Sequence, residues 1–424
     1  MYIIYAILAF SLLIIVHELG HFIMAKVNGI AVEEFAIGMG PKIVSIQGKE
    51  TKYSIGILPI GGYVKMLGEE EDVEDKRSFS SKSPLRRISV ILAGSIMNFL
   101  LALVLFILIL SKNGYTVPEV GVVKENTPAY ESGLQTGDKF LNIDGDKVFS
   151  ADDVSVAISM SKGEPVDIVI ERDGEVKEVT ITTKENSEKR YAIGIYFAKK
   201  NGDILPEVGE VQDNTPAYEA GLQSGDKFLS INGETIVSSE DISAAISMSK
   251  GEPIDITLER DGEIKEVTIT PKENNEKVYD VGFSFVREDN PTFVESIEQS
   301  FKQTASLIVQ TFKGLKMMVT GEANFKTDVG GPVTIIKLSG EAAKNGIMSL
   351  MYFTAFISVN LAVFNLLPFP ALDGGWTVIL LIELITKKKV PEKVVATVNY
   401  IGIMLLFGLM ILVTVKDILF PIKF

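Results

Sequence analysis

Four stretches of this 424-residue chain are long, apolar and uncharged. They cover residues 2–16, 88–110, 346–372 and 394–415. A short polar motif follows the first stretch, and residues 22–25 after that motif are again apolar. A helix of about 20 apolar residues is long enough to cross a hydrocarbon core about 30 Å thick. The pattern therefore predicts four transmembrane helices. The apolar N-terminus has neither a basic region nor a clear cleavage site, which favours a membrane helix over a cleaved signal peptide.

Lysine and arginine in the short connecting segments predict the orientation of these helices. Residues 28–87 are rich in both types and residues 387–393 are rich in lysine, so we expect both segments on the cytoplasmic side. The long region 112–290 should then lie outside. The net charge of -14 argues against nucleic acid as a partner, because phosphate binding needs clustered basic residues. Cysteine is absent, so any metal must be held by nitrogen and oxygen.

The outer region contains an internal repeat. EVGVVKENTPAYESGLQTGDKF starts at residue 119 and EVGEVQDNTPAYEAGLQSGDKF at residue 207, a period of 88 residues. This period is too long for a solenoid, so we predict two tandem copies of one small β-rich domain, at residues 115–200 and 203–288.

Each copy resembles a circularly permuted bacterial PDZ domain. The resemblance implies that peptides add as a strand to a sheet edge and that a glycine-containing loop holds the peptide carboxylate. The alternative is a β-rich spacer, or a steric filter that needs no ligand. The implied carboxylate loops are Ile193, Gly194 and Ile195 in the first copy and Val281, Gly282 and Phe283 in the second.

Both histidines of the chain, His17 and His21, lie in the motif VHELGH at the end of the first apolar stretch. At a spacing of four they share one face of a helix, where both imidazoles can reach Zn²⁺. Zinc lowers the pKa of a coordinated water, and Glu18 can take the proton of that water. A chance match to a short motif is the alternative. Ionisable side chains at membrane depth are costly, however, and favour a functional site.

A catalytic zinc needs a third protein ligand and an open position. With no other histidine and no cysteine, that ligand must be a carboxylate, and Asp373 in the segment NLLPFPALDGG is best placed. The prolines and glycines around it predict irregular backbone, which membrane proteins tolerate where it lines a cavity. The alternative is that Asp373 only caps the helix that follows.

These motifs together resemble an intramembrane site-2 zinc metalloprotease, and within that family the bacterial RseP/RasP-like regulators. The resemblance implies zinc as cofactor, His17, His21 and Asp373 as ligands, and Glu18 as catalytic acid and base. It implies cleavage inside the membrane segment of single-pass proteins, such as anti-sigma factors or signal-peptide remnants. An upstream site-1-type protease would first remove the outer domain of the substrate. The implied location is the bacterial plasma membrane, with the PDZ domains outside and the active site near the cytoplasmic side.

Further residues match the family by resemblance. Asn98, which follows Gly94 by four residues, and the pair Asn360 and Asn365 fit family asparagines that could hold the substrate. The alternative for all three asparagines is hydrogen bonding between helices. Residues 53–66, with Gly61 and Gly62, resemble a membrane-re-entrant β-loop that pairs with the substrate, and an ordinary cytoplasmic hairpin is the alternative. Trp376 stands where many relatives have a histidine.

The predicted fold is thus a polytopic α-helical membrane protein with two inserted β-rich domains and a membrane-associated β-hairpin loop. An amphipathic helix at residues 291–320 should lie on the outer membrane surface or pack under the two domains, or else be a connector that buries its apolar face. A second function remains open, a membrane-anchored PDZ peptide-binding scaffold with an inert metal site. The predicted boundaries are 1–27, 88–111, 346–385 and 394–420 for the transmembrane helices and 28–87 for the segment with the β-loop.

Overall fold

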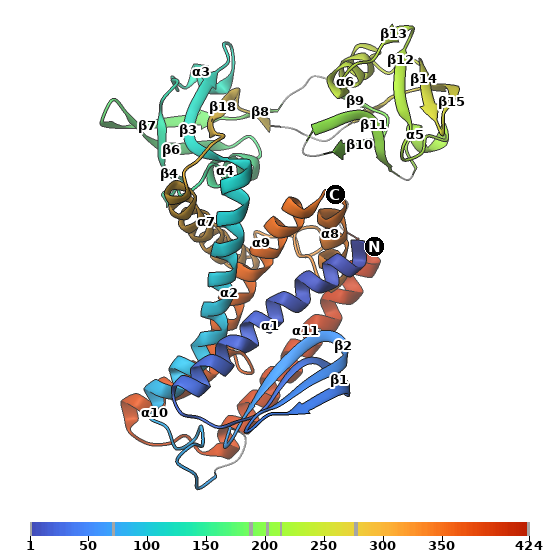
Figure 1. The fold of residues 1–424 in the computed structure, drawn as a ribbon. Helices are drawn as coiled ribbons and strands as arrows, with labels where there is room; N and C mark the ends of the chain where they lie inside the picture. The colour runs from blue at the N-terminus through green and yellow to red at the C-terminus, as the bar shows by residue number, and fades with distance from the viewer. Residues whose placement is uncertain are drawn as a thin grey trace.

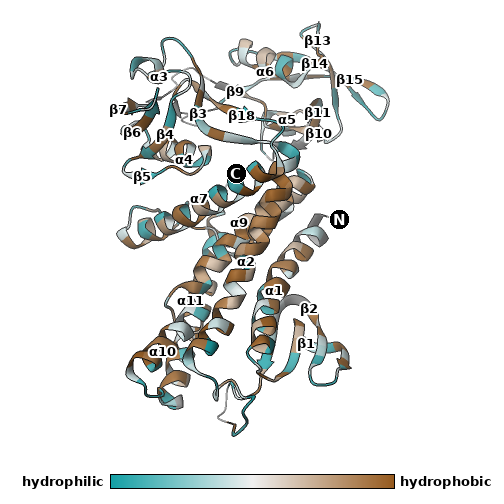
Figure 2. Ribbon diagram, turned by 60° about the vertical axis from the view of Figure 1, so that its left-hand side comes forward, coloured by the Kyte–Doolittle hydropathy of each residue, from teal (hydrophilic) through white to brown (hydrophobic). Residues whose placement is uncertain are grey.

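The computed structural model describes residues 2–69, 73–185, 190–200, 203–212, 214–274 and 279–421. Figure 1 shows a bundle of helices with a small β-sheet at one end and two β-rich domains at the other. The colouring by hydropathy in Figure 2 shows that the helices of the bundle are mainly hydrophobic, whereas the β-rich domains mix hydrophobic and hydrophilic residues. Four described helices are long and apolar enough to span a membrane, at Ile7–Val27, Pro84–Asn113, Ile347–Leu366 and Lys393–Leu419. The prediction of four apolar helices with β-rich regions is confirmed.

The central helix of the bundle is α2 (Pro84–Asn113), which packs against α1 (Tyr2–Val27) and α9 (Ile347–Leu366). Gly20 on α1 sits against the backbone of Ala93, where any Cβ would clash, so the two helix backbones approach closely. The last helix, α11 (Glu392–Leu419), is mostly exposed along its apolar length.

The predicted helix at 346–385 is wrong as a single element. The chain forms α9, breaks after Leu366, and restarts as α10 (Asp373–Thr386). Pro368 and Pro370 cannot donate helical hydrogen bonds, and Ala371 adopts a φ of 73°. The break therefore places Asp373 in the first turn of a new helix.

The segment between α1 and α2 forms a curled antiparallel sheet from β1 (Val32–Gln47) and β2 (Lys52–Met66). Both strands bend, so Ala36 pairs with Tyr63 on one side and with Ser54 on the other. The part of β2 at residues 62–66 is thereby an edge of this sheet, and β2 packs along α1.

The region between α2 and α7 folds as two similar domains, each with a six-stranded sheet. The likeness extends to side chains, because Arg172 pairs with the fully buried Asp138 in one domain as Arg260 pairs with Asp226 in the other. The first sheet contains β3 (Tyr115–Val123), β4 (Lys139–Ile143), β5 (Asp146–Lys147), β6 (Pro165–Arg172), β7 (Glu175–Thr182) and β18 (Phe283–Glu288), with helices α3 (Pro128–Glu131) and α4 (Ala151–Ser161). The second contains β10 (Ile195–Lys200), β11 (Asp203–Val211), β12 (Lys227–Ile231), β13 (Glu234–Thr235), β14 (Ile254–Arg260) and β15 (Glu263–Ile269), with α5 (Pro216–Glu219) and α6 (Ser239–Met248).

The predicted boundaries 115–200 and 203–288 are wrong, because the second domain is nested inside the first. Only two residues separate β10 from β11, so these strands pair as a local hairpin in the second sheet. The last strand, β18, returns to pair with β3 and completes the first sheet. The two connections between the domains form short antiparallel ribbons, β8 (Lys184–Glu185) with β17 (Tyr279–Asp280) and β9 (Arg190–Ala192) with β16 (Lys272–Asn274).

Helix α7 (Phe293–Thr320) confirms the predicted amphipathic helix but not the idea that it buries its apolar face. Its buried residues are polar except for Leu307, whereas Phe301 and Phe312 are exposed. A further helix, α8 (Pro332–Lys344), was not predicted. Its first turn is held by Asp417 of α11, which accepts hydrogen bonds from the backbone N–H groups of Gly331 and Thr334.

Candidate metal centre and active site

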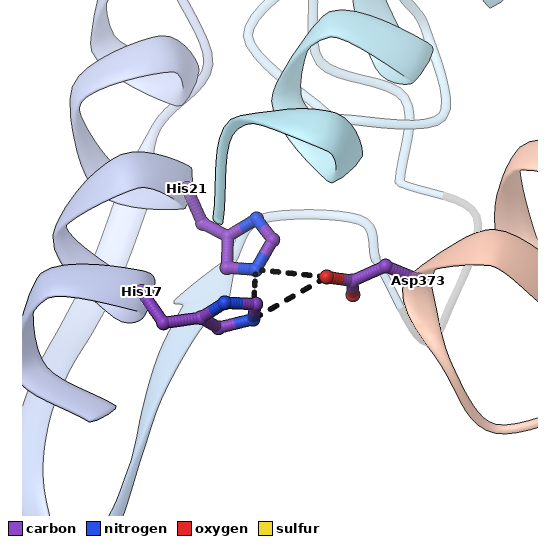
Figure 3. Close-up of side chains that lie close together, drawn as sticks. All are labelled: His17, His21 and Asp373. Carbon is purple, nitrogen blue, oxygen red and sulfur yellow. Dashed lines mark hydrogen bonds and ion pairs between the residues drawn. The ribbon is translucent and has the colours of Figure 1, made fainter. Parts of the chain in front are cut away.

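Three predicted ligands meet between α1 and the start of α10 (Figure 3). Nε2 of His17 lies 3.1 Å from Nε2 of His21. Oδ2 of Asp373 lies 3.3 Å from Nε2 of His17 and 3.6 Å from Nε2 of His21. Both histidines are buried, and Asp373 is only partly exposed. The two imidazole nitrogens and the carboxylate oxygen thus face a common point, although Asp373 lies 356 residues after His17 in the chain.

This donor set fits a zinc ion. Ligand atoms about 2.0–2.1 Å from a tetrahedral zinc are about 3.3–3.4 Å from one another. The three separations observed here bracket that value. Oδ2 of Asp373 is buried without a hydrogen-bond partner, which is costly for a carboxylate unless a cation satisfies it. His17, His21 and Asp373 are therefore the residues that would hold the metal.

Helix α2 supports the imidazole of His21. Nδ1 of His21 lies 2.9 Å from the carbonyl oxygen of Val90. A carbonyl only accepts, so Nδ1 must donate its proton, and Nε2 is left with a lone pair for a metal. The sequence gives no signal for this contact, because a backbone carbonyl can come from any residue type.

Gly94 lies directly beneath the two imidazoles. A Cβ at this position would lie 2.7 Å from both Cε1 and Nε2 of His17 and would clash with Nε2 of His21. The sequence predicts a small residue here for close helix approach. The structure adds that the space is needed by the rings themselves.

Glu18 is partly buried beside the histidines and faces the sheet. A Cβ on Gly62 of β2 would lie 3.2 Å from Cγ of Glu18 and 2.9 Å from the carbonyl oxygen of Ala36. The absence of a side chain at Gly62 therefore lets the edge of the sheet pass close to Glu18. Gly61, with a φ of 86°, makes the bend that precedes this edge.

A tight turn positions Asp373. Gly374 and Gly375 pack against the carbonyl groups of Leu367 and Phe369, where a Cβ would clash. Leu372 precedes the first turn of α10, and no side chain caps this helix. Because Oδ2 of Asp373 faces the histidines, the geometry favours a ligand over the alternative of a simple helix cap.

A cavity of about 900 Å³ opens beside the edge of the sheet. Residues 63–66 of β2 and Leu67, which follows the strand, form one wall, and Trp376 and Leu380 of α10 form another. Arg87 and Glu383, which form a buried ion pair between α2 and α10, also line it. Trp376, three residues after Asp373, is therefore a wall of this cavity.

The three predicted asparagines do not lie together. Asn98 is fully buried, and its Nδ2 lies 3.3 Å from Nδ1 of His17. Asn360 accepts a hydrogen bond from Thr311 of α7 and donates one to the carbonyl of Phe356, which matches the alternative of bonding between helices. Asn365 is partly exposed in the last turn of α9.

The predicted carboxylate loops lead into the edge strands β10 and β18, but they have exchanged domains. The loop at Gly194, expected in the first domain, belongs to the second, and the loop at Gly282, expected in the second, belongs to the first. Val281 and Phe283 pack in the core of the first domain, and Ile193 and Ile195 pack in that of the second. Gly282 and Gly194 adopt φ values of 82° and 86°, which favour glycine.

Comparisons with known proteins agree with a metalloprotease centre of this kind. A family model described as "Peptidase family M50" matches residues 5–409. The chain belongs to this family of site-2 zinc metalloproteases. It is 43% identical, over 100% of both chains, to a Clostridium perfringens protein provisionally named a zinc metalloprotease. It is 31% identical to the regulator of sigma E protease of Haemophilus influenzae, over 97% of each chain.

Solved structures match only parts of the chain. A serine endoprotease from Yersinia pestis is 28% identical over 21% of this chain and 30% of its own, with a TM-score of 0.19. The HtrA3 PDZ domain bound to a phage-derived ligand is 24% identical over 20% of this chain and 86% of its own, with a TM-score of 0.17. These scores are too low to support any argument about the present fold.

Proposed function

We propose that this protein is a zinc-dependent endopeptidase that cleaves single-pass membrane proteins inside their transmembrane segment. One observation carries the proposal, the convergence of His17, His21 and Asp373 within the depth of the candidate span Ile7–Val27. Burying such groups among apolar helices costs free energy, so ionisable side chains in such places are usually functional. Membership of a family of zinc metalloproteases supports zinc as the metal.

Glu18 is the proposed acid and base. Bound zinc would acidify a water and polarise the scissile carbonyl. Glu18 follows His17 directly on the same helix, and its side chain lies against Gly62 at the edge of β2. Its carboxylate takes a proton from the attacking water and returns it to the leaving amine.

The edge of β2 is the proposed guide for the substrate. Peptide bonds in a helix are shielded by their own hydrogen bonds, so the substrate must become extended before cleavage. Residues 62–66 form a sheet edge beside Glu18, and residues 63–66 of this edge line the cavity. A substrate segment that adds to this edge as a strand would present a carbonyl to the metal centre.

The two outer domains are proposed to act as PDZ-like filters or peptide-binding modules. Their edge strands β18 and β10 follow the glycine loops at Gly282 and Gly194, the arrangement that strand addition requires. They lie at the opposite end of the bundle from β1 and β2 (Figure 1). With the lysine-rich segments cytoplasmic, they would face the outside of a bacterial plasma membrane. They would admit substrates, such as anti-sigma factors or signal-peptide remnants, only after another protease has removed the outer domain.

Helix α7 is proposed to lie in the lipid interface on the outer side of the plasma membrane. Its polar side packs on the protein, while Phe301 and Phe312 are 58% and 52% exposed on the other side. An apolar face turned away from the protein is typical of a helix in the lipid interface.

A paired measurement tests the proposed function. Zinc content and cleavage of a pre-truncated single-pass model substrate are compared in detergent for the unaltered protein and for Glu18→Gln, which keeps the shape of the side chain. We expect near-stoichiometric zinc in both proteins and cleavage only by the unaltered one. Cleavage by Glu18→Gln at the normal rate would remove Glu18 from the mechanism. Zinc in neither protein would overturn the metal centre itself.

A further inference from the structure

Helix α2 faces the two histidines with three residues spaced by four. Val90 supplies the carbonyl that accepts from His21, and Gly94 supplies the space beneath both rings. Asn98, one turn further on, reaches His17. Since residues at this spacing share one helix face, a single face of α2 supports the whole histidine pair.

Asn98 is the only polar side chain among these three residues, and its surroundings are well defined. It is 0% exposed, and its Nδ2 lies 3.3 Å from Nδ1 of His17. Its Oδ1 is buried without a hydrogen-bond partner. The backbone at Asn98 is fixed from the other side, where Ser358 of α9 donates a hydrogen bond of 2.8 Å to its carbonyl oxygen.

The lone pairs at the metal centre determine which way this amide must point. Nε2 of His17 faces Nε2 of His21 and Oδ2 of Asp373, so Nε2 must be unprotonated to bind a metal. The neutral ring then carries its proton on Nδ1, which needs an acceptor. An amide turned by 180° has nearly the same shape and places Oδ1 opposite that proton. The same rotation gives Oδ1 a partner and moves Nδ2 to the position where Oδ1 had none.

We infer that Asn98 is a positioning residue that accepts the Nδ1 proton of His17 and holds its Nε2 toward the metal. The inference rests on the proposed metal centre and goes beyond it. It also replaces the predicted substrate contact, since a fully buried amide occupied by His17 does not face a substrate. Asn98 thus does for His17 what the carbonyl of Val90 does for His21.

The inference is tested by zinc affinity, measured without substrate. Metal-free protein in detergent is titrated with zinc against a competing chelator. Asn98→Leu, which has a similar shape and no acceptor, should weaken zinc binding about 10- to 100-fold. Asn98→Asp keeps an acceptor and should stay close to the unaltered protein. Ser95→Ala is the matched control, because Ser95 is fully buried on the same helix and its Oγ has no partner.

A second readout observes the proton directly. Only two histidines occur in the chain, so labelling histidine with ¹⁵N gives nuclear magnetic resonance signals from the two imidazoles alone. In the zinc-loaded protein the His17 signals should show a proton on Nδ1 that exchanges slowly with water. In Asn98→Leu that proton should exchange faster, while His21 is unchanged.

The outcomes are distinct. Equal zinc affinity for Asn98→Leu and the unaltered protein, with only the KM for substrate raised, would make Asn98 a substrate contact and overturn the inference. Weak binding by both Asn98→Asp and Asn98→Leu would show that an acceptor is not what His17 requires. The thermal unfolding midpoints of the metal-free variants distinguish these results from a loss of fold. If Asn98→Leu does not fold, the zinc affinity and the labelled spectrum of Asn98→Asp still test the inference. Absence of zinc from the unaltered protein would instead overturn the proposed function.

Discussion

Gly94 of α2 and His17 of α1 lie so close that a Cβ on the glycine would be 2.7 Å from Nε2 of the imidazole. The candidate metal centre therefore lies where α1 packs on α2, and α10 brings Asp373 to it. Any residue larger than glycine at position 94 competes with the histidines for the same volume.

The Gly94→Ala variant should lose zinc. The added methyl group would displace both imidazoles, so we expect metal content to fall by at least about 10-fold, measured by elemental analysis of purified protein. Gly408→Ala is the control, since Gly408 lies in the membrane helix α11 with open space around it. Full zinc in Gly94→Ala would mean that α1 and α2 can separate without cost.

The buried pair of Arg87 and Glu383 should be far more sensitive to loss of one partner than of both. The two side chains are 9% and 7% exposed and join α2 to the end of α10. Glu383→Leu leaves an uncompensated buried guanidinium, which should cost about 3–5 kcal/mol of stability. The double variant Arg87→Met with Glu383→Leu should recover most of that loss. Unfolding in denaturant measures both, and equal loss in the single and double variants would contradict the expectation.

Acid should weaken the attachment of the sheet to α1. Hydrogen bonds from Lys26 and Arg77 lower the pKa of Glu50 from 4.5 to about 2. A carboxyl group with a lowered pKa stabilises the fold above its unfolded pKa, and that contribution is lost as the pH falls through 4.5 toward 2.

The Glu50→Gln variant isolates this effect. Glu50 and Arg77 are more than one-third exposed, so solvent screening makes the contribution small. The thermal unfolding midpoint of the unaltered protein should fall more steeply with acidification over this window than the midpoint of Glu50→Gln. Parallel curves for the two proteins would show that Glu50 is not responsible.

The nested domains predict which fragments fold. Residues 190–274 contain every strand of the second sheet and the closing ribbon of β9 with β16, so this fragment should fold alone. Residues 115–200 lack β18 and leave the core that contains Val281 open, so this fragment should not. Amide spectra of the two fragments distinguish folded from unfolded chains. A well-dispersed spectrum for 115–200 would restore the tandem arrangement.

Local patterns were enough to predict much of this protein. Uncharged apolar runs predict the membrane helices, since helix length must match the hydrocarbon core. The spacing of His17 and His21 predicts a shared face, because it depends only on helix geometry. The two prolines before Asp373 indicate irregular backbone, although the predicted boundaries 346–385 treat the two helices α9 and α10 as one element.

Other features depended on contacts that no local pattern contains. Strand β18 could pair with β3 of the first sheet or stay with the second repeat, to which it belongs in sequence. Its pairing with β3 is a long-range contact, and it competes with the two-residue hairpin that joins β10 to β11. Because the two repeats have equivalent sequences, the sequence does not reveal which pairing is the more stable. The carbonyl of Val90 and the side to which α7 turns its polar residues are likewise set by neighbours distant in sequence.

The sequence by itself determined the chemistry, namely two histidines and a glutamate at membrane depth and an aspartate after a broken helix. Those choices follow from residue type and spacing along one element. The tertiary structure alone decided that Asp373 meets the histidines, that Asn98 reaches His17, and that Gly62 lies against Glu18. Such meetings depend on how whole helices and strands pack, and packing is fixed by the summed contacts of residues far apart in the chain.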